Sequence, residues 1–402
     1  MKRVLLVNTS GDVAARRLQD RTDLRLSVIT SPNYRGFYRP ETDVTYVENV
    51  EDLTQVRLAA LEIRRRNAFE HVVSPSEYSL QAAGYVRSYF GIPGIGYEAA
   101  NAFSNKYVMK QKLAAAGLPV ARFRLLGSFE DAADAARELG WPVVVKPALG
   151  GGSEDIFAVR DAAHLAELAS SERTASLRNS PYPMIAEEFV DIGTEYHCDG
   201  AVVDGEVRFA SVSKYFTPLL QAVGDLVGSY TVPLDDPLAK EIRELHDAAV
   251  AALGLTGGVT HLEVFETAGG LLIGEVSCRP GGGGIADLVA HHHGVDPWHV
   301  LIETSLGESP AVDVRTVDGC SAVYFLPRPQ GTIVELSTAE ELRALPGVTH
   351  VEVRAKVGEV ETGAVHSATQ TGFVLLNAPT EAEVAAHVAA LTRAYRIRTE
   401  RA

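Results

Sequence analysis

Two acidic residues in the second half of the chain have the spacing expected of a metal site. Glu263 and Glu275 lie in apolar segments joined by the turn Gly269-Gly270, which predicts a β-hairpin with the two carboxylates side by side. Facing carboxylates repel each other unless a cation lies between them, and their oxygens suit Mg²⁺ bound to nucleotide phosphates. Arg279 is predicted on the same face, where it offers a positive charge to a carboxylate or oxyanion. A pair of exposed hairpin glutamates is the alternative.

A second segment combines a lysine at the end of a predicted strand with a glycine-rich loop. Lys146 is followed by Gly150, Gly151, Gly152 and Ser153. Backbone N–H groups of such a loop can close over phosphates while the lysine neutralises their charge. The segment lacks the Gly-Lys-Ser/Thr ending of a P-loop. A flexible surface turn is therefore an equally good reading of this loop alone.

A third segment, Glu187-Glu188-Phe189-Val190, is followed by Glu195 and has the character of an adenosine site. Main-chain groups of its four residues can contact the edge of adenine, and Glu195 can accept hydrogen bonds from ribose hydroxyls. The alternative is an acidic strand end in solvent.

Composition restricts the class of protein. The 402 residues carry a net charge of -15, which argues against non-specific nucleic-acid binding. Three scattered cysteines do not form a disulfide framework or a CxxC metal site. The first residues lack the apolar core of a signal peptide, and no segment approaches the ~20 apolar residues of a membrane span. We therefore expect a folded protein of the cytoplasm, without nucleic-acid or membrane partners.

The first hundred residues alternate short apolar segments with helical periodicity. Strands are predicted at 4–7, 24–29, 44–47 and 71–74, and a helix at 53–66. This alternation predicts a parallel, doubly wound α/β domain that ends near residue 100.

The rest of the chain is predicted to form a small α+β subdomain at 119–190, a central antiparallel region, and a third, smaller β-rich unit beyond about residue 310. Helices are predicted at 105–116, 129–139, 162–170, 236–253 and 381–393. Strands are predicted at 143–146, 184–189, 259–265 and 271–276, with a hairpin at 197–213.

Taken in order, these segments resemble the ATP-grasp superfamily, in particular carboxylate-amine ligases related to L-amino acid ligases and carnosine synthases. The segments that carry the resemblance are Asn105-Lys106, Lys146 with the glycine loop, Glu187 to Glu195, Ser213-Lys214, Glu263 with Glu275, and Arg279-Pro280-Gly281-Gly282. The resemblance implies an α/β and α+β architecture. Its parts are an N-terminal domain at 1–100, an ATP-grasp domain at 101–310 with its lid at 119–190, and a C-terminal domain at 311–402.

The resemblance also implies a role for individual residues, with ATP and Mg²⁺ as cofactors and Mn²⁺ as a potential substitute. The implied nucleotide contacts are Lys106, Lys146, Gly151, Gly152, Ser153, Glu187, Glu188, Phe189, Val190 and Glu195. The implied metal positions are Glu263, Glu275 and Ser277, the last standing where many relatives have asparagine. The implied catalytic residues are Lys214, which can reach the γ-phosphate, and Arg279. The implied substrate positions are Glu77, Arg279, Gly282 and Gly283.

The activity implied is ATP-dependent joining of a small carboxylate and a small amine through an acyl phosphate, with lids at 150–152 and 217–230. Two alternatives stay open: a ligase for a carrier protein or biosynthetic intermediate, and a nucleotide-binding regulatory protein without turnover. We expect the chain to act alone or as a homodimer. His291-His292-His293 is interpreted as a helix end, because successive helical residues point in different directions.

Overall fold

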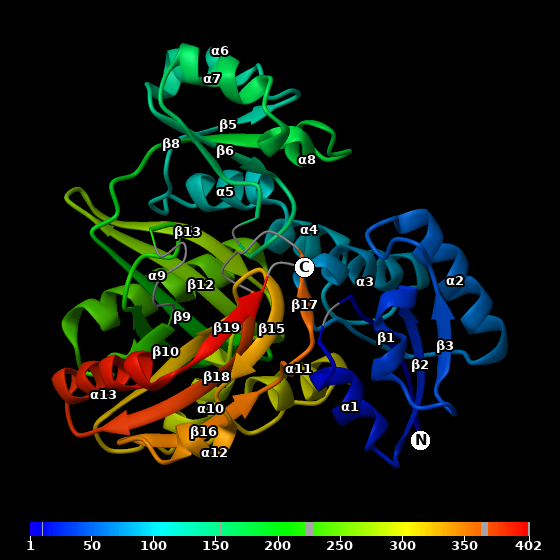
Figure 1. The fold of residues 1–402 in the computed structure, drawn as a ribbon. Coiled ribbons are helices and arrows are strands. Elements are labelled where there is room, and N and C mark those ends of the chain that lie inside the picture. Colours follow the sequence, from blue (N-terminus) through cyan, green and yellow to red (C-terminus); the bar gives the residue numbers. More distant parts are fainter. Residues whose placement is uncertain (10, 153, 222–227, 363–368, 401–402) are drawn as a thin grey trace.

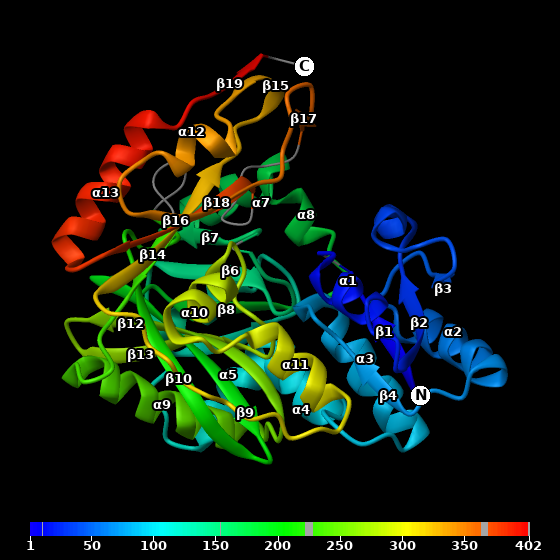
Figure 2. The same ribbon diagram turned by 90° about the horizontal axis from the view of Figure 1, so that it is seen from below.

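The computed structural model describes residues 1–9, 11–152, 154–221, 228–362 and 369–400. An N-terminal domain, a lid and a large central sheet are distinct in Figure 1, where the lid projects above the sheet. Figure 2 shows the N-terminal domain on one side of the molecule and the last strands and helices on another. Among the described residues, no helix combines the length and apolar character that crossing a membrane requires.

The N-terminal domain is a parallel sheet with helices on both faces, as predicted. Its strand order is β3-β2-β1-β4. The strands are β1 (Lys2–Val7), β2 (Leu24–Thr30), β3 (Asp43–Tyr46) and β4 (His71–Val73). The helices are α1 (Val13–Gln19), α2 (Leu53–Arg66) and α3 (Glu77–Phe90). Side chains of β1 alternate between two hydrophobic clusters, so both faces of the sheet are buried.

The lid is a four-stranded antiparallel sheet in the order β5-β8-β6-β7. Its strands are β5 (Phe123–Leu126), β6 (Val143–Pro147), β7 (Phe157–Val159) and β8 (Met184–Glu188). Its helices are α6 (Ala132–Leu139), α7 (Ala162–Ala169) and α8 (Ala175–Arg178). Buried alanine and leucine side chains of α6 and α7 pack on valines of the sheet and give the lid a hydrophobic core of its own.

The central sheet has eight antiparallel strands in the order β13-β12-β9-β10-β11-β14-β18-β16. The first five are β13 (Gly270–Ser277), β12 (Gly258–Thr267), β9 (Thr194–Val203), β10 (Glu206–Tyr215) and β11 (Gly228–Thr231). One face packs against α4 (Tyr97–Ser104), α5 (Lys106–Ala115) and α9 (Pro237–Leu253). The other packs against α10 (Ile285–His293) and α11 (Pro297–Ser305) and borders the cavity described below.

The C-terminal region is joined to the central sheet more closely than the sequence indicated. Its strands β14 (Cys320–Pro327), β18 (Gln370–Ala378) and β16 (Val348–Val353) continue that sheet, because β11 pairs with β14. The predicted boundary near residue 310 lies in the connection before β14. A separate small sheet contains β15 (Gly331–Leu336), β17 (Val360–Glu361) and β19 (Ile397–Glu400). Helices α12 (Ala339–Arg343) and α13 (Glu381–Ala394) complete the region.

A β-bulge in β13 determines which way the second acidic residue points. Val264 pairs with Ile273 but Glu263 pairs with Glu275, so Gly274 is the extra residue. Ile273 belongs to the core beneath the sheet, whereas Glu275 lines the cavity on the opposite face. Without the extra residue, strict alternation would put both on the same face. A side chain at Gly274 would place its Cβ 2.6 Å from the Phe265 ring, which favours glycine at the bulge.

Candidate active site

A cavity of about 400 Å³ lies where the N-terminal domain, the lid and the central sheet meet. The charged residues that line it include Glu77, Lys106, Lys146, Glu263 and Glu275. They come from α3, α5, β6, β12 and β13. The hydrophobic cores of the N-terminal domain, the lid and the central sheet hold these elements in place. The fold therefore gathers five charges, separated by up to 198 positions in sequence, around one space.

The pair Glu263 and Glu275 occupies directly opposite positions on β12 and β13, as the hairpin predicted. Burial and the charges of Glu195 and Glu275 raise the pKa of Glu263 to about 8. Burial opposes ionisation of Glu275 as well, but Lys106 and Lys146 outweigh it and lower that pKa to about 2. The Lys106 Nζ lies 3.0 Å from a Glu275 carboxylate oxygen. The raised pKa of Glu263 means that ionising both carboxylates is unfavourable with these lysines alone, and a divalent cation between them would favour it.

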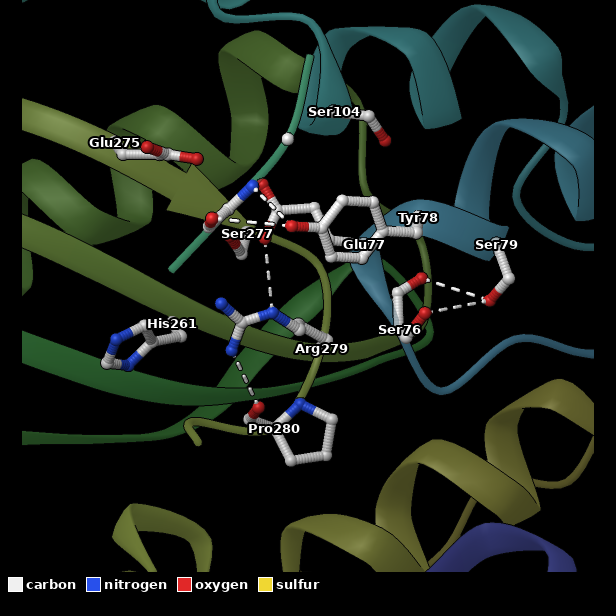
Figure 3. Close-up of polar contacts among 12 residues, drawn as sticks. Ser76, Glu77, Tyr78, Ser79, Ser104, His261, Glu275, Ser277, Arg279 and Pro280 are labelled. Carbon is white, nitrogen blue, oxygen red and sulfur yellow. Dashed lines mark hydrogen bonds and ion pairs between the residues drawn. The ribbon is translucent and has the colours of Figure 1, made fainter. Parts of the chain in front are cut away.

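Glu77, at the first position of α3, faces the end of β13 (Figure 3). Its Oε2 accepts hydrogen bonds from Arg279 Nε at 3.2 Å and from Ser277 Oγ at 3.3 Å. Its Oε1 lies 4.0 Å from Lys106 Nζ and has no hydrogen-bond partner among the described residues. Burial and the charge of Glu275 raise the pKa of Glu77 to about 7. An unsatisfied acceptor on this oxygen favours a donor supplied by a ligand.

A second cluster of charge, the lid wall, joins the lid to α5 and contains more bases than acids. The Glu187 Oε1 lies 2.9 Å from Lys146 Nζ and 3.5 Å from Lys110 Nζ. Burial would raise the pKa of Glu187, but Lys110 and Lys146 outweigh it and hold this pKa below its usual value. Lys110 is 1% exposed, one helical turn after Lys106 on α5. The sequence analysis missed Lys110, because a lysine on a polar helix is usually in solvent.

The glycine loop, residues 149–152, borders the cavity between these two walls. Lys106 donates a hydrogen bond from Nζ to the Gly150 carbonyl oxygen, so the same lysine contacts the loop and Glu275. Gly151 and Gly152 line the cavity, and Ser153 lies outside the described residues. Backbone N–H groups in a glycine-rich loop are suited to phosphate oxygens.

The comparisons with known proteins agree with this geometry. Residues 111–293 match the ATP-grasp domain, and residues 323–400 match the L-amino acid ligase C-terminal domain 2. The chain is 36% identical over 367 residues to the L-arginine-specific L-amino acid ligase of Bacillus subtilis, covering 90% of this chain and 89% of that protein. The chain belongs to the L-amino acid ligase family of ATP-grasp proteins. It is an ATP-dependent ligase that forms amide bonds on amino acids.

More distant relatives share parts of the ligase or its fold. The D-alanine–D-alanine ligase of Nocardia farcinica is 32% identical over 207 residues, which cover 48% of this chain and 55% of that enzyme. The crystal structure of an L-amino acid ligase from Bacillus licheniformis superposes with a TM-score of 0.79 at 18% identity, covering 100% of this chain and 99% of that one. The N-terminal domain, lid, central sheet and C-terminal strands therefore form one shared architecture.

Several predicted contacts of the ligase are not at the cavity surface. Glu187, Glu188, Phe189 and Val190 are absent from the described residues that line it, although Glu187 binds Lys146, which does. Phe189 is 48% exposed, and the Glu188 carboxylate is 2.6 Å from the guanidinium of exposed Arg122. In this conformation the segment therefore does not border the cavity.

Glu195, the residue predicted to contact ribose, does line the cavity. Its carboxylate is hydrogen bonded to a loop of the ligase itself. Its Oε2 accepts a hydrogen bond from the Leu219 N–H at 2.7 Å, and burial raises its pKa to about 7. Leu219 and Leu220 also line the cavity. Part of the second predicted lid, 217–221 and 228–230, is thus described, whereas 222–227 lies outside the described residues.

Lys214 is placed differently from the sequence-based expectation. It lies opposite Tyr196 in the β9–β10 pairing, and Tyr196 belongs to the core between the sheet and α9. Tyr215, the next residue along β10, faces the cavity. Because neighbouring strand residues point to opposite faces, Lys214 points away from the cavity. It is absent from the described residues that line it, so the γ-phosphate role is not available to Lys214 in this conformation.

The predicted Gly282 and Gly283 also line the cavity. Gly283 has φ +66°, and a Cβ there would lie 2.8 Å from the Phe325 ring.

The predicted helix-end histidines fit their interpretation, since His292 and His293 are buried in α10 and hydrogen bond to Ser321 and Ser211.

His261, interpreted from the sequence as a structural residue beside the metal pair, belongs to a buried histidine network next to Glu263. Asp199 bridges His197 Nδ1 at 2.6 Å and His261 Nδ1 at 2.9 Å, and His197 Nε2 lies 2.7 Å from Ser229 Oγ. His261 lines the cavity two residues before Glu263 on β12. Because these ring nitrogens already bind Asp199 and Ser229, the network links side chains of β12, β9 and β11 rather than presenting open metal ligands.

Proposed function

We propose that this ligase joins the carboxyl group of one amino acid to the amino group of a second through an acyl phosphate, releasing ADP and phosphate. The observation that carries the mechanism is the meeting of Glu263 and Glu275 with Lys106, Lys146 and Arg279 in one cavity. The arrangement provides both the charge neutralisation that phosphoryl transfer needs and a cation for the reacting carboxylate.

In this mechanism Lys106 and Lys146 neutralise the phosphates of ATP, and the main chain of the glycine loop covers them, while the Gly151 N–H donates to the Tyr78 hydroxyl. Glu263 and Glu275 would hold Mg²⁺, which supplies charge neutralisation to the terminal phosphates when bound, and Mn²⁺ would substitute for it. The raised pKa of Glu263 fits a divalent cation between the two carboxylates. Adenine would lie against the main chain of 187–190, and Glu195 would exchange the Leu219 N–H for the ribose hydroxyls.

The substrate carboxylate attacks the γ-phosphorus and forms the acyl phosphate. Arg279 stabilises first this carboxylate and then the oxyanion that forms when the second amine attacks. Glu77 holds the ammonium group of the first amino acid on its unsatisfied Oε1. This role explains why a carboxylate at the start of α3 is buried against Arg279 and Ser277 and yet keeps one oxygen without a partner.

A basic side chain on one substrate is favoured by Glu51. This residue lines the cavity, burial raises the pKa of its carboxyl, and no ion pair involves it among the described residues. The Bacillus subtilis relative is named as specific for L-arginine, which has the cation such a carboxylate would bind. Replacing L-arginine by neutral L-citrulline should lower kcat/KM by about tenfold or more, and Glu51→Gln should remove most of this difference. Equal use of both amino acids would exclude the assignment.

The test of the proposed function is to incubate the purified protein with ATP, Mg²⁺ and amino acids singly and in pairs. ADP and amide should form in equal amounts with particular pairs. If ATP binds and ADP forms but no pair yields an amide, a carrier-protein substrate is favoured. If ATP binds and no ADP forms under any condition, a regulatory protein is favoured.

The remaining proposals concern location and assembly. We propose a cytoplasmic enzyme because all three cysteines are buried and unpaired, which suits a reducing compartment. A homodimer stays a prediction, and sedimentation of the purified protein would decide it.

A further inference from the structure

Tyr78 connects the N-terminal domain to the glycine loop of the lid. It is the second residue of α3, beside Glu77, and its hydroxyl donates a hydrogen bond to the Gly151 carbonyl at 3.3 Å. The same hydroxyl accepts from the Gly151 N–H at 3.2 Å. These contacts lie next to the Glu77–Arg279 ion pair in Figure 3. One side chain therefore satisfies both main-chain groups of a single loop residue.

The loop lies directly on the start of α3 at this point. A Cβ atom built on Gly151 would lie 2.8 Å from Glu77 Oε2, so a larger residue there would require the loop or the Glu77 carboxylate to shift. On its other side, Gly150 accepts a hydrogen bond from Lys106. The loop is thus held between α5 of the central region and α3 of the N-terminal domain.

A second, smaller cavity lies behind this contact. Its volume is about 20 Å³, which is room for about one water molecule. Glu77, Tyr78 and Gly150 line both this cavity and the large one, so they form part of the wall between the two spaces. If the loop moved away from Tyr78, water from the smaller polar space would reach the large cavity.

We propose that Tyr78 is a positioning residue whose hydroxyl holds the glycine loop closed over the acyl phosphate and excludes water from it. This inference rests on the proposed function. Water that reaches the acyl phosphate cleaves it to the carboxylic acid and inorganic phosphate, so one ATP becomes ADP and phosphate without an amide. The Tyr78 hydroxyl therefore determines how many ATP molecules are used for each amide, rather than how tightly ATP binds.

The experiment compares Tyr78→Phe with the wild-type full-length ligase, using Mg²⁺, ATP and the best amino-acid pair from the panel. The ratio of ADP to amide should rise by about fivefold in the variant, the size expected from losing a hydrogen bond. The extra ADP should require the amino acids, because it comes from their acyl phosphate. The KM for ATP should stay near the wild-type value.

Tyr85→Phe is the matched control, since it makes the same change on the same helix where the ring packs against Tyr89 and Tyr97. Its ADP to amide ratio should equal that of the wild type. An unchanged ratio in Tyr78→Phe, whatever its kcat, would overturn the proposal, and so would a rise of equal size in Tyr85→Phe.

Hydrogen exchange provides a second measurement that needs no turnover. With Mg²⁺ and a non-hydrolysable ATP analogue, the peptide covering 149–152 should exchange about fivefold faster in Tyr78→Phe than in the wild type. Equal exchange would overturn the proposal even if the wild-type protein formed no amide from the panel. Failure of the proposed function and failure of the Tyr78 assignment are therefore distinguishable.

Discussion

Two buried clusters of charge, one at the central sheet and one between the lid and α5, differ in their balance of acids and bases. The sheet wall contains three acids, Glu77, Glu263 and Glu275, with Lys106 and Arg279 as its bases. The lid wall contains one acid, Glu187, with the two bases Lys110 and Lys146. Acidic groups therefore outnumber bases on the sheet wall, and bases outnumber acidic groups on the lid wall.

The pKa values express the same difference. Burial, with the neighbouring carboxylates, raises the pKa of Glu263 to about 8 on the sheet wall. On the lid wall, Lys110 and Lys146 overcome burial and hold the pKa of Glu187 below its usual value. A ligand that brings a cation to the first wall and phosphates to the second would neutralise both. The balance of acids and bases on the two walls therefore suits binding of a metal–nucleotide complex, rather than direct pairing of one wall with the other.

The largest expected effect comes from removing charge on the sheet wall. Glu275→Gln keeps the size of the side chain but removes the carboxylate that faces Glu263 and binds Lys106. Amide formation should fall by about 10³-fold, because one electrostatic group in an active site has that effect. The measurement is kcat/KM for ADP release with the best amino-acid pair.

Glu266→Gln is the control for this variant. Glu266 lies on the same hairpin, opposite Leu271, and its carboxylate accepts from the Tyr196 hydroxyl away from the cavity. Its activity should stay within about threefold of the wild type. Comparable losses in the two variants would mean that hairpin stability, rather than the charge of the sheet wall, is being measured.

On the lid wall the expected effect is on folding. Glu187→Gln would leave Lys110 and Lys146 buried without their counter-ion, and the free energy of unfolding should fall by about 3 kcal/mol. The neighbouring Glu188→Gln removes a carboxylate paired with exposed Arg122, so its cost should stay below about 1 kcal/mol. Urea unfolding of both variants measures this. Equal costs would show that Glu187 is not the counter-ion on which the lid wall depends.

The sequence predicted the sheet wall better than the lid wall, for a physical reason. Glu263 and Glu275 are joined by a short turn, so local pairing decides their distance. The bulge at Gly274 was not predictable from alternation. One extra residue in a strand reverses the face of the sheet to which every later side chain points. Lys110 was missed because its burial depends on Glu187, which is 77 positions away in sequence and belongs to another subdomain.

Lys214 illustrates the limit of motif order. The family resemblance placed it near the γ-phosphate, but its pairing with Tyr196 turns it towards the core beneath the sheet. The contact between Glu77 and Arg279 was also beyond local reasoning, since it joins two domains across 202 positions. The helices, the strands and the parallel character of the first sheet followed from periodicity, whereas the strand order and the contacts between domains required the assembled fold.

A smaller effect should appear in the pH dependence of metal binding to the sheet wall. A pKa of about 8 keeps Glu263 protonated below that pH in the absence of metal, and Mg²⁺ has to displace the proton. The half-saturating Mg²⁺ concentration should therefore fall as pH rises from 6.5 to 8, by up to about tenfold per pH unit, and level off above. Magnesium titrations at a fixed nucleotide concentration measure it.

Glu263→Gln cannot lose this proton, so its weaker Mg²⁺ binding should lack the slope. A slope that persists unchanged in this variant would assign the proton to another group, of which Glu77 with a pKa of about 7 is the next on the same wall.

The smallest effect separates two roles for Ser277 on the sheet wall. The family pattern assigns this position to the metal, but its hydroxyl donates to Glu77 Oε2. Ser277→Ala should therefore raise the KM of the amino acid whose ammonium group Glu77 binds, by about threefold, and leave the half-saturating Mg²⁺ concentration unchanged. Ser213→Ala removes a buried hydroxyl without a hydrogen-bond partner among the described residues and should change neither value. A higher Mg²⁺ requirement with an unchanged KM would return Ser277 to the metal, and the sheet wall would then bind its cation through three residues rather than two.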